Sequence, residues 1–489
     1  MVLAGAAGSG CVLLTIGLAA GHVAGAGTGA LAAASFLLLV AWCGAHRRVD
    51  QTLAALALYL GLLDGYVKLR TGSPTVTLAR DVLVAAIAAG ALLRAMLTQQ
   101  RLAVPPLGGF VIAFGAIVLV ELLNPAARGV TAGLAGVRQH LEFVPLFFLG
   151  YAFLRRETQI EKLLIILVLC AAAGGVVSYI QSTLTPQELA GWGAGYRERV
   201  LGTGYFTGAP RVAFDAGGNT FVRPFGLGSD QGAGAITAAL ALPALIALLM
   251  GARGIVRWAA FPAAIGIALA VATSGSRAAL VTVLVSAATF GVLATASRNA
   301  ARVAVGLVVS AALVFAAFQQ LGSANNTRER ARSIAPTKVF ATFSTERGVS
   351  AAKFVEYATH YPLGIGVGSL GPAASVGAAD AGTRAQFAQR FNAETEWNFL
   401  VLEMGLAGLA VYLALNLRLM WLAFTRIRRI DDPVMRLYLA ALAAPLVGLL
   451  VGGFAGPTTA TVPPAPYLWL VAGVLSYWLV TKRSATQES

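Results

Sequence analysis

The sequence has little charge. Of its 489 residues, only 12% are Asp, Glu, Lys or Arg, whereas 57% are hydrophobic, and the mean hydropathy is +0.75. A soluble domain carries about 25% charged residues, so a soluble core is excluded. Apolar runs of about 20 residues, each long enough to cross a bilayer as a helix, recur along the whole chain. We therefore predict an all-α polytopic membrane protein.

Cysteine and histidine are also scarce. The three cysteines, Cys11, Cys43 and Cys170, lie inside apolar runs and make no disulfide framework, so they do not indicate the compartment. The four histidines are scattered, and the absence of HExxH, DxD and CxxC argues against a metal site. No GxxxxGK[ST] segment suggests a nucleotide site. We expect no metal, no cofactor and no nucleic-acid partner.

The apolar runs predict about fourteen membrane-spanning helices, with twelve or thirteen as the alternative. Their approximate bounds are 4–22, 28–45, 52–66, 80–98, 106–123, 140–155, 161–180, 231–251, 255–275, 278–297, 302–320, 396–417, 434–455 and 466–481. The first run has no basic segment and no clear cleavage site, so we interpret it as uncleaved. Lys and Arg in the short connections fall on one side, which predicts that this side and both termini are cytoplasmic.

These spans divide the chain into four parts. Residues 1–120 are predicted to be N-terminal transmembrane helices, and 121–321 a transmembrane core with an outer loop at 181–229. Residues 322–393 form a large outer loop, and 394–489 the C-terminal transmembrane helices. Because connections longer than about 15 residues are usually functional or disordered, the large loop is predicted to have a role.

Three arginines stand at predicted membrane boundaries on the outer side. Arg277 lies in a connection of a few residues, Arg138 lies where a span begins, and Arg223 precedes the next span. An unpaired charge in the bilayer costs about 2.5–3.5 kcal/mol on insertion scales. A guanidinium suits phosphate, because its fork matches two oxygens at once. The alternatives are snorkelling to lipid phosphate or pairing with Asp230. Three arginines on one side favour a shared anionic ligand.

The large outer loop closes with a glycine-rich turn. A predicted amphipathic helix, "GVSAAKFVEYATHY", includes His360 and stops at Pro362. Gly364, Gly366 and Gly368 follow, and we expect them to form a flexible run that acts as a lid or an acceptor-binding loop.

Acidic residues follow this loop. Glu394 and Glu396 lie in the first turn of the next predicted helix, where they either complement the helix dipole or act in catalysis. Asn392 or Thr395 could cap that helix. Glu403 lies inside the apolar span, which predicts a structural or relay role.

Several of these segments form an ordered set. They are "NPAARGVTAGLAGVRQHLEFVPLFF", the Arg223-Pro-Phe-Gly segment, "SGSRAAL", "HYPLGIGVG" and "ETEWNFLVLEMGLAGLA". Over roughly residues 120–410 this order resembles the O-antigen ligase and polysaccharide polymerase family of bacterial inner-membrane proteins. The resemblance implies a GT-C-like, metal-independent glycosyltransferase with periplasmic loops, whose donor is a glycan on undecaprenyl diphosphate. Expected partners are this donor, a lipid-linked acceptor, the bilayer and polysaccharide assembly proteins.

The resemblance also implies roles for residues. Arg277 and Arg223 would hold the donor diphosphate, Arg138 would support the same anion, and the segment from His360 to Gly368 would shape the sugar site. The ligase histidine expected eleven residues before Gly405 is replaced by Glu394. This departure favours a polymerase over a ligase.

The chemistry that follows needs one base and no covalent nucleophile, which predicts inversion. Glu394 or Glu396 is the candidate base, with His360 as the alternative. A ligase that transfers glycan to lipid A core, and a flippase for the lipid-linked glycan, remain as alternative functions.

Overall fold

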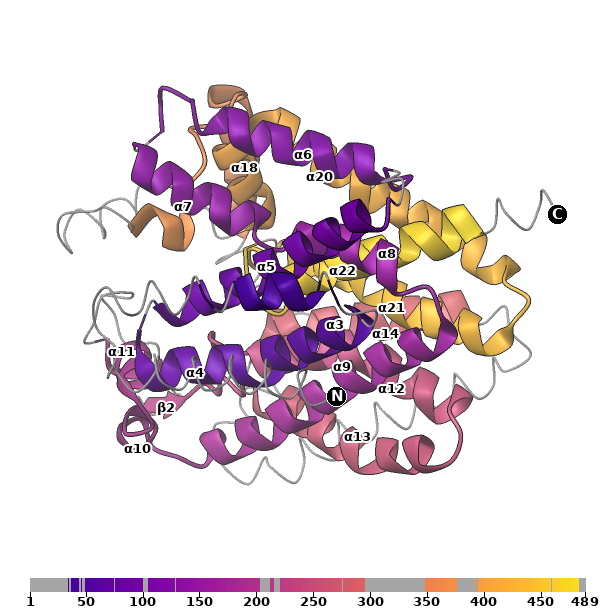
Figure 1. Ribbon diagram of the computed structural model, residues 1–489. Coiled ribbons are helices and arrows are strands. Elements are labelled where there is room, and N and C mark those ends of the chain that lie inside the picture. Colours follow the sequence, from indigo (N-terminus) through magenta and orange to yellow (C-terminus); the bar gives the residue numbers. More distant parts are fainter. Residues whose placement is uncertain are drawn as a thin grey trace.

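The protein was analysed as a computed structural model (Figure 1). The structure describes residues 34, 37–43, 45, 49–73, 75–99, 104–127, 129–202, 212–214, 220–274, 276–294, 348–375, 391, 395–458 and 460–482. The predicted spans 4–22 and 302–320, half of 28–45, and Glu394 lie outside these residues.

Helices make up most of the described chain, and the described strands form one short hairpin. The first half holds α3 (Val49–Leu58), a π-helix η1 (Tyr59–Leu63), α4 (Asp64–Thr71), α5 (Thr75–Leu97), α6 (Gly108–Glu121), α7 (Val130–Leu141), α8 (Pro145–Phe153), α9 (Glu157–Ser182), α10 (Pro186–Ala190) and α11 (Ala194–Leu201). The rest holds β1 (Val212–Phe214), β2 (Thr220–Val222), α12 (Ala233–Gly251), α13 (Ile255–Thr273), α14 (Arg277–Ala294), α18 (Gly348–His360), η3 (Gly371–Ser375), α20 (Glu396–Arg426), η4 (Ile427–Arg429), α21 (Pro433–Gly452), α22 (Pro464–Ser476) and η5 (Tyr477–Thr481). β1 and β2 pair antiparallel, with Ala213 opposite Phe221.

The prediction of a polytopic all-α membrane protein is supported. Among the described residues, seven helical segments are long and apolar enough to cross a membrane. They are Val49–Thr71, Glu157–Ser182, Ala233–Gly251, Ile255–Thr273, Glu396–Arg429, Pro433–Gly452 and Pro464–Thr481. Each corresponds to a predicted span. Gly108–Glu121 and Ala278–Ala294 are shorter apolar helices at two further predicted spans.

The predicted span 140–155 is wrong as a single helix. α7 ends at Leu141 and α8 begins at Pro145, with turns between them. Proline has no N–H to donate and fits the first turn of a helix, so α8 starts anew at that residue. The apolar pattern alone did not separate a short buried helix pair from one long span.

Most of the helices run lengthwise across the view, whereas α18 stands upright against them (Figure 1). α9 packs against α12 and α13, α14 packs against α21, and α6 packs against α20. α10, α11 and β2 lie together at the left-hand end of the view, and the C-terminus lies at the right. We refer to these as the α10–α11 end and the C-terminal end.

The C-terminal end carries basic side chains bound to helix termini. Arg426 donates to the Leu479 carbonyl at 2.7 Å, and Arg428 donates to the Val292 carbonyl at 3.1 Å. Lys482 lies 4.0 Å above the ring of Trp478. The two hydrogen bonds join the end of α20 and η4 to η5 and to the end of α14. The sequence predicts that these cations lie on the cytoplasmic side.

A small separate core anchors the α10–α11 end. Its buried residues come from α4, α10, α11, β2 and the segment that follows β2: Leu69, Leu189, Tyr196, Val200, Val222 and Phe225. Thr185 and Glu188 form a capping box at α10, with Thr185 N donating to the Glu188 carboxylate at 2.7 Å. This backbone bond, together with one from the Thr185 hydroxyl, lowers the pKa of Glu188. The core and the cap position the segment that contains Arg223.

Close helix packing depends on individual glycines. A Cβ placed on Gly175 of α9 would lie 1.8 Å from the carbonyl oxygen of Gly266 on α13. The neighbouring Gly174 differs, because a Cβ there would meet no described atom within 4 Å. Small residues at such crossings let helix backbones approach closely in membranes.

We therefore expect Gly175→Ala to destabilise the protein by about 1–3 kcal/mol, because the added methyl group would force α9 and α13 apart. Gly174→Ala is the matched control and should leave stability nearly unchanged. Thermal unfolding of the two purified variants in detergent measures the difference. Equal unfolding midpoints would contradict this account of the α9–α13 contact.

Candidate functional site

The segments that carry Arg223 and Arg277 adjoin at the α10–α11 end. Pro224 accepts a hydrogen bond from Gly232 N at 2.9 Å, which folds the segment after Arg223 back on itself. A Cβ on Gly232 would lie 3.3 Å from Cβ of Ser276. Ser276 caps α14, because its Oγ accepts from Ala279 N at 3.3 Å. Arg277 is thus the first residue of α14 and lies next to the Arg223 segment.

Arg223 is exposed, and it follows the last residue of β2. Arg199, on α11, pairs with Asp230 at 2.8 Å. The Asp230 carboxylate is therefore bound by Arg199, whereas the sequence analysis considered it as a partner for Arg138, Arg223 or Arg277.

Glu396 is completely buried at the start of α20. Its backbone N donates to the Gly453 carbonyl at 2.7 Å, and its carboxylate accepts a hydrogen bond from Thr458 N. Thr395 caps the helix by accepting from Asn398 N at 3.2 Å, so the predicted capping role is confirmed for Thr395. Glu396 is 0% exposed, and its carboxylate faces the Thr458 segment and not an open surface.

Glu396 is connected to α14 through the end of α21. A Cβ on Gly452 would lie 2.8 Å from Oγ1 of Thr282, and the next residue, Gly453, binds Glu396. Thr282 lies five residues after Arg277, or about 7.5 Å along the helix. The starts of α14 and α20, far apart in the sequence, therefore lie on neighbouring parts of the bundle.

Arg138 is paired with a carboxylate of another helix. Its Nε lies 2.5 Å from Oδ2 of Asp81, and its side chain is 39% exposed. Asp81 comes from α5, so Arg138 connects α7 to α5. The guanidinium predicted to support an anion is thus already paired with a carboxylate.

A buried charged network lies beside this pair, and we call it the Arg80 network. Arg80 on α5 binds Oδ2 of Asp64 at 3.1 Å and both carboxylate oxygens of Glu142, one of them at 2.9 Å. Its guanidinium also lies 5.2 Å from the ring centre of Phe143. The sequence analysis missed this network. The signal was available, because Asp64 is an ionisable residue inside the predicted span 52–66.

The glycine-rich turn is closely packed rather than a free run. Gly364, Gly366 and Gly368 have φ of +79°, +89° and +80°, which favours glycine at all three positions. A Cβ on Gly366 would lie 2.7 Å from Ala127, and one on Gly368 would lie 1.8 Å from the Ala132 carbonyl oxygen. The turn is therefore enclosed by the α6–α7 region, which differs from the flexible lid expected from the sequence.

This turn also fills a break in α20. Gly405 has φ +64° and ψ −171°, so the helix is interrupted there. Leu406 N donates to the Pro362 carbonyl at 2.8 Å, and Ile365 N donates to the Leu402 carbonyl at 2.6 Å. The backbone groups freed by the break are thus bonded to the turn.

Glu403 fastens the same turn from its far end. One carboxylate oxygen accepts from Leu370 N at 2.8 Å, and the other lies 2.6 Å from Nε2 of His140 on α7. Both side chains are fully buried. Of the two roles predicted for Glu403, these contacts match the structural one.

His360 lies apart from Glu396. It is the exposed last residue of α18, and its Nδ1 lies 2.9 Å from the Glu356 carbonyl oxygen. The other end of α18 contacts the start of α20, where Asn398 donates to the Ser350 carbonyl at 2.6 Å. Ser350 and His360 are ten positions apart on the helix, or about 15 Å. The structure therefore does not bring these two candidate bases together.

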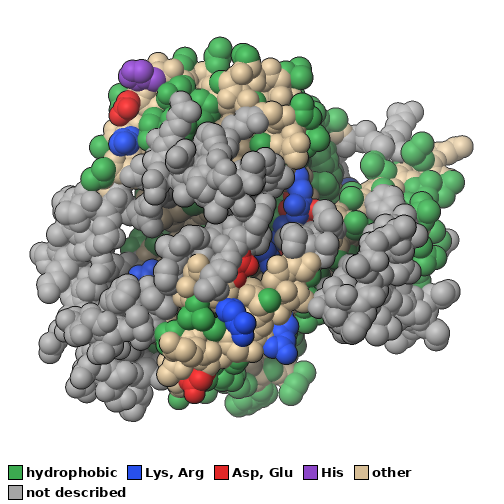
Figure 2. Space-filling view, turned by 90° about the vertical axis from the view of Figure 1, so that its left-hand side faces the viewer, with side chains coloured by type: hydrophobic (Ala, Val, Ile, Leu, Met, Phe, Trp, Pro, Cys, Tyr) green, Lys and Arg blue, Asp and Glu red, His purple; other side chains and the backbone are tan. Residues whose placement is uncertain are grey.

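The surface of the α10–α11 end is mixed in charge. Figure 2 looks onto this end and shows Lys and Arg side chains spread over it, with Asp and Glu among them. Within the part of the chain that the structure describes, no three His, Cys, Asp or Glu residues are grouped so as to hold a metal ion.

The Arg80 network makes a stability prediction. Arg80→Met would leave Asp64 and Glu142 buried without a counter-charge, which costs about 3–5 kcal/mol. Adding Asp64→Asn to this variant should recover part of the loss. Arg253→Met, at an exposed position, is the control. Thermal unfolding in detergent measures all three, and an unchanged midpoint for Arg80→Met would refute the assigned pairing.

The comparisons with known proteins leave the family of this chain open. No protein-family model matches the sequence, and no curated protein matches it.

Proposed function

We propose that this protein is a membrane glycosyltransferase that polymerises glycan repeat units from an undecaprenyl-diphosphate-linked donor. It acts at the periplasmic face of a bacterial inner membrane, and both of its termini are cytoplasmic. The reaction is metal-independent and inverts the anomeric carbon. The ordered motifs that resemble the O-antigen ligase and polysaccharide polymerase family motivate this proposal.

One observation carries it furthest. The Arg223 segment, the start of α14 at Arg277 and the start of α20 at Glu396 adjoin at one end of an apolar helical bundle. Arg277 follows Arg223 by 54 residues in the sequence, and Glu396 follows Arg277 by 119. Cations and a carboxylate on neighbouring elements are what phosphate departure and proton removal require.

The leaving diphosphate gains negative charge as the glycosidic bond breaks. Arginine guanidinium groups near a low-dielectric boundary stabilise that charge better than water does. Arg277 also begins a helix, and the free N–H groups of a helix start favour an anion. In this proposal Arg277 and Arg223 bind the diphosphate. Arg138 supports them indirectly, because it is paired with Asp81.

A sugar hydroxyl of the acceptor attacks the anomeric carbon, and a carboxylate removes its proton. Glu394 or Glu396 supplies this base. The prenyl tail of the donor stays in the bilayer, so the donor approaches sideways between helices. The Gly364–Gly368 turn is held by α7 and α20, so in this proposal it is a fixed element and not a moving lid.

The direct test is the product that purified protein forms in detergent from two lipid-linked repeat units, compared with one unit plus lipid A core. Chain growth supports the polymerase. Transfer to lipid A core alone would identify a ligase, and transport in vesicles without either product would identify a flippase.

In this assay we expect Arg277→Ala to lower the rate by about 10²–10³, because it removes the main charge that stabilises the leaving group. Arg223→Ala should act in the same direction. Arg253 follows the far end of α12, so Arg253→Ala is the matched control. Full activity of Arg277→Ala, with the protein inserted normally, would remove the diphosphate argument.

The base is tested by Glu394→Gln and Glu396→Gln. We expect one of them to lower turnover by about 10²–10⁴ while donor binding stays nearly unchanged. Because glutamine keeps an oxygen that can accept from Thr458 N, Glu396→Gln should fold normally. Unfolding midpoints of both variants provide the control. Unchanged turnover in both would move the base elsewhere, with His360 next to be tested.

A further inference from the structure

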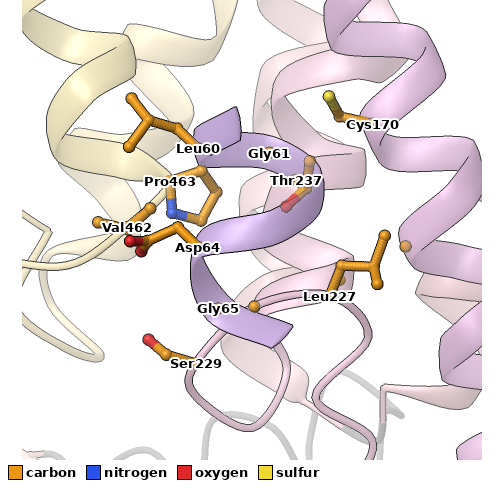
Figure 3. A pocket seen from close by; sticks show the side chains of 13 residues that line it. Leu60, Gly61, Asp64, Gly65, Cys170, Leu227, Ser229, Thr237, Val462 and Pro463 are labelled. Carbon is orange, nitrogen blue, oxygen red and sulfur yellow. The ribbon is translucent and has the colours of Figure 1, made fainter. Parts of the chain in front are cut away.

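A narrow cleft lies beside the candidate site at the α10–α11 end (Figure 3). It is bounded by η1 and α4, by α9, by the segment before α12 and by the residues before α22. The space inside it is small, about 10 Å³, which is room for about one water-sized group. The polar side chains on its wall are Asp64, Ser229 and Thr237.

Asp64 is the charged group of this cleft. Figure 3 shows it extending from its helix towards Val462 and Pro463, with Ser229 on the loop below. The residue is 1% exposed, and its Oδ2 is bound by Arg80 at 3.1 Å. Among the described residues, its other oxygen, Oδ1, is buried without a hydrogen-bond partner. A buried carboxylate oxygen is costly unless a donor reaches it, so this oxygen calls for a donor from outside the described protein atoms.

The local backbone points to a site as well. Asp64 directly follows η1, a π-helical turn between α3 and α4, and Leu60 and Gly61 of that turn line the cleft. Single π-helical turns within α-helices occur frequently at functional sites, because they shift the register of the side chains that follow. Here the shifted register brings Asp64 to the wall of the cleft.

Open space is present on the opposite wall. Gly174 of α9 lines the cleft, and a Cβ at this position would meet no described atom within 4 Å. On the near side, a Cβ on Gly65 would lie 2.4 Å from the Leu227 carbonyl oxygen, so the cleft is tight there. The cleft therefore admits a group of the size of one hydroxyl beside Gly174, rather than a whole sugar ring.

The cleft adjoins the Arg223 segment. Ser229 and Gly228 belong to the loop that runs from Arg223 to Gly232, and Gly232 abuts Ser276. A molecule that reaches Asp64 through the mouth of the cleft thus lies next to the predicted diphosphate position.

We propose that Asp64 Oδ1 accepts a hydrogen bond from a hydroxyl of a neutral sugar, and that this contact positions the acceptor glycan. The inference rests on the proposed glycosyltransferase function for the identity of that sugar as the acceptor. Arg80 pairs with Oδ2 of the carboxylate, and the sugar hydroxyl donates a hydrogen bond to Oδ1. A uronic acid is disfavoured, because its carboxylate would approach a buried negative charge.

Binding is tested by saturation-transfer NMR on the full-length protein in nanodiscs. The probes are the free neutral sugars glucose, galactose, mannose and rhamnose, with glucuronate as the anionic comparison. We expect saturation transfer to at least one neutral sugar and none to glucuronate. Asp64→Asn should weaken that binding about tenfold, because the hydroxyl would then donate to a neutral amide oxygen and not to a charged carboxylate.

Gly174→Val provides a second variant that leaves Asp64 and Arg80 unchanged and fills the cleft, so it should also abolish the signal. Gly109→Val is the matched control, because a Cβ at Gly109 likewise meets no described atom within 4 Å but lies outside the cleft. Equal sugar binding in wild type, Asp64→Asn and Gly174→Val would overturn the proposal. A second outcome would also overturn it: no sugar signal, together with sodium binding that ²³Na relaxation detects in the wild type and that Asp64→Asn abolishes.

Binding and catalysis separate the two proposals. Sugar binding that depends on Asp64, in a protein that forms no polymer, would retain the sugar site and reject the polymerase. In an active polymerase, Asp64→Asn should raise the KM for the acceptor and change kcat little. An active polymerase whose acceptor KM is unchanged in both cleft variants would reject the role of Asp64.

Discussion

The interruption of α20 at Gly405 is the constraint on which this arrangement depends. Within a bilayer there is no water to bind the backbone groups that a broken helix releases, so protein must bind them. Pro362 and Ile365 do so, and Glu403 ties Leu370 to His140 of α7. Three segments that the sequence analysis identified separately, in α7, after α18 and in α20, are thereby one packed unit. Glu396 is the first residue of α20, so it belongs to the helix that this unit holds in place.

The hydropathy pattern predicted the long apolar helices among the described residues, but it did not predict their contacts. Long apolar runs such as 161–180 and 231–251 predicted helices that the structure contains, and Thr395 was identified as a cap. The run 140–155 failed, because Pro145 starts a new helix within a continuous apolar stretch. A one-dimensional average does not register a break when the residues on both sides are equally apolar.

The candidate site shows the same division. Arg277 was noticed because it lies alone between two apolar spans. Its closeness to the Arg223 segment depends on the contact between Gly232 and Ser276, which no sequence spacing predicts. The glycines of the turn after α18 were recognised, but their number suggested mobility, whereas their positive φ serves close packing. Arg80 and Asp64 were overlooked because they lie in different predicted spans, and ion pairing between helices depends on the tertiary fold.

The Arg80 network also bears on how the chain enters the membrane. Asp64 and Arg80 lie on the two arms of a helical hairpin formed by α4 and α5, and only three residues, 72–74, join these helices. If either arm entered the lipid alone, its ionised group would lack the partner that the other arm supplies in the folded protein, at a cost of up to about 2.5–3.5 kcal/mol. When the two arms enter together, the opposite charges meet during insertion and partition as a neutral pair. The translocation machinery would therefore release α4 and α5 into the bilayer as a single unit.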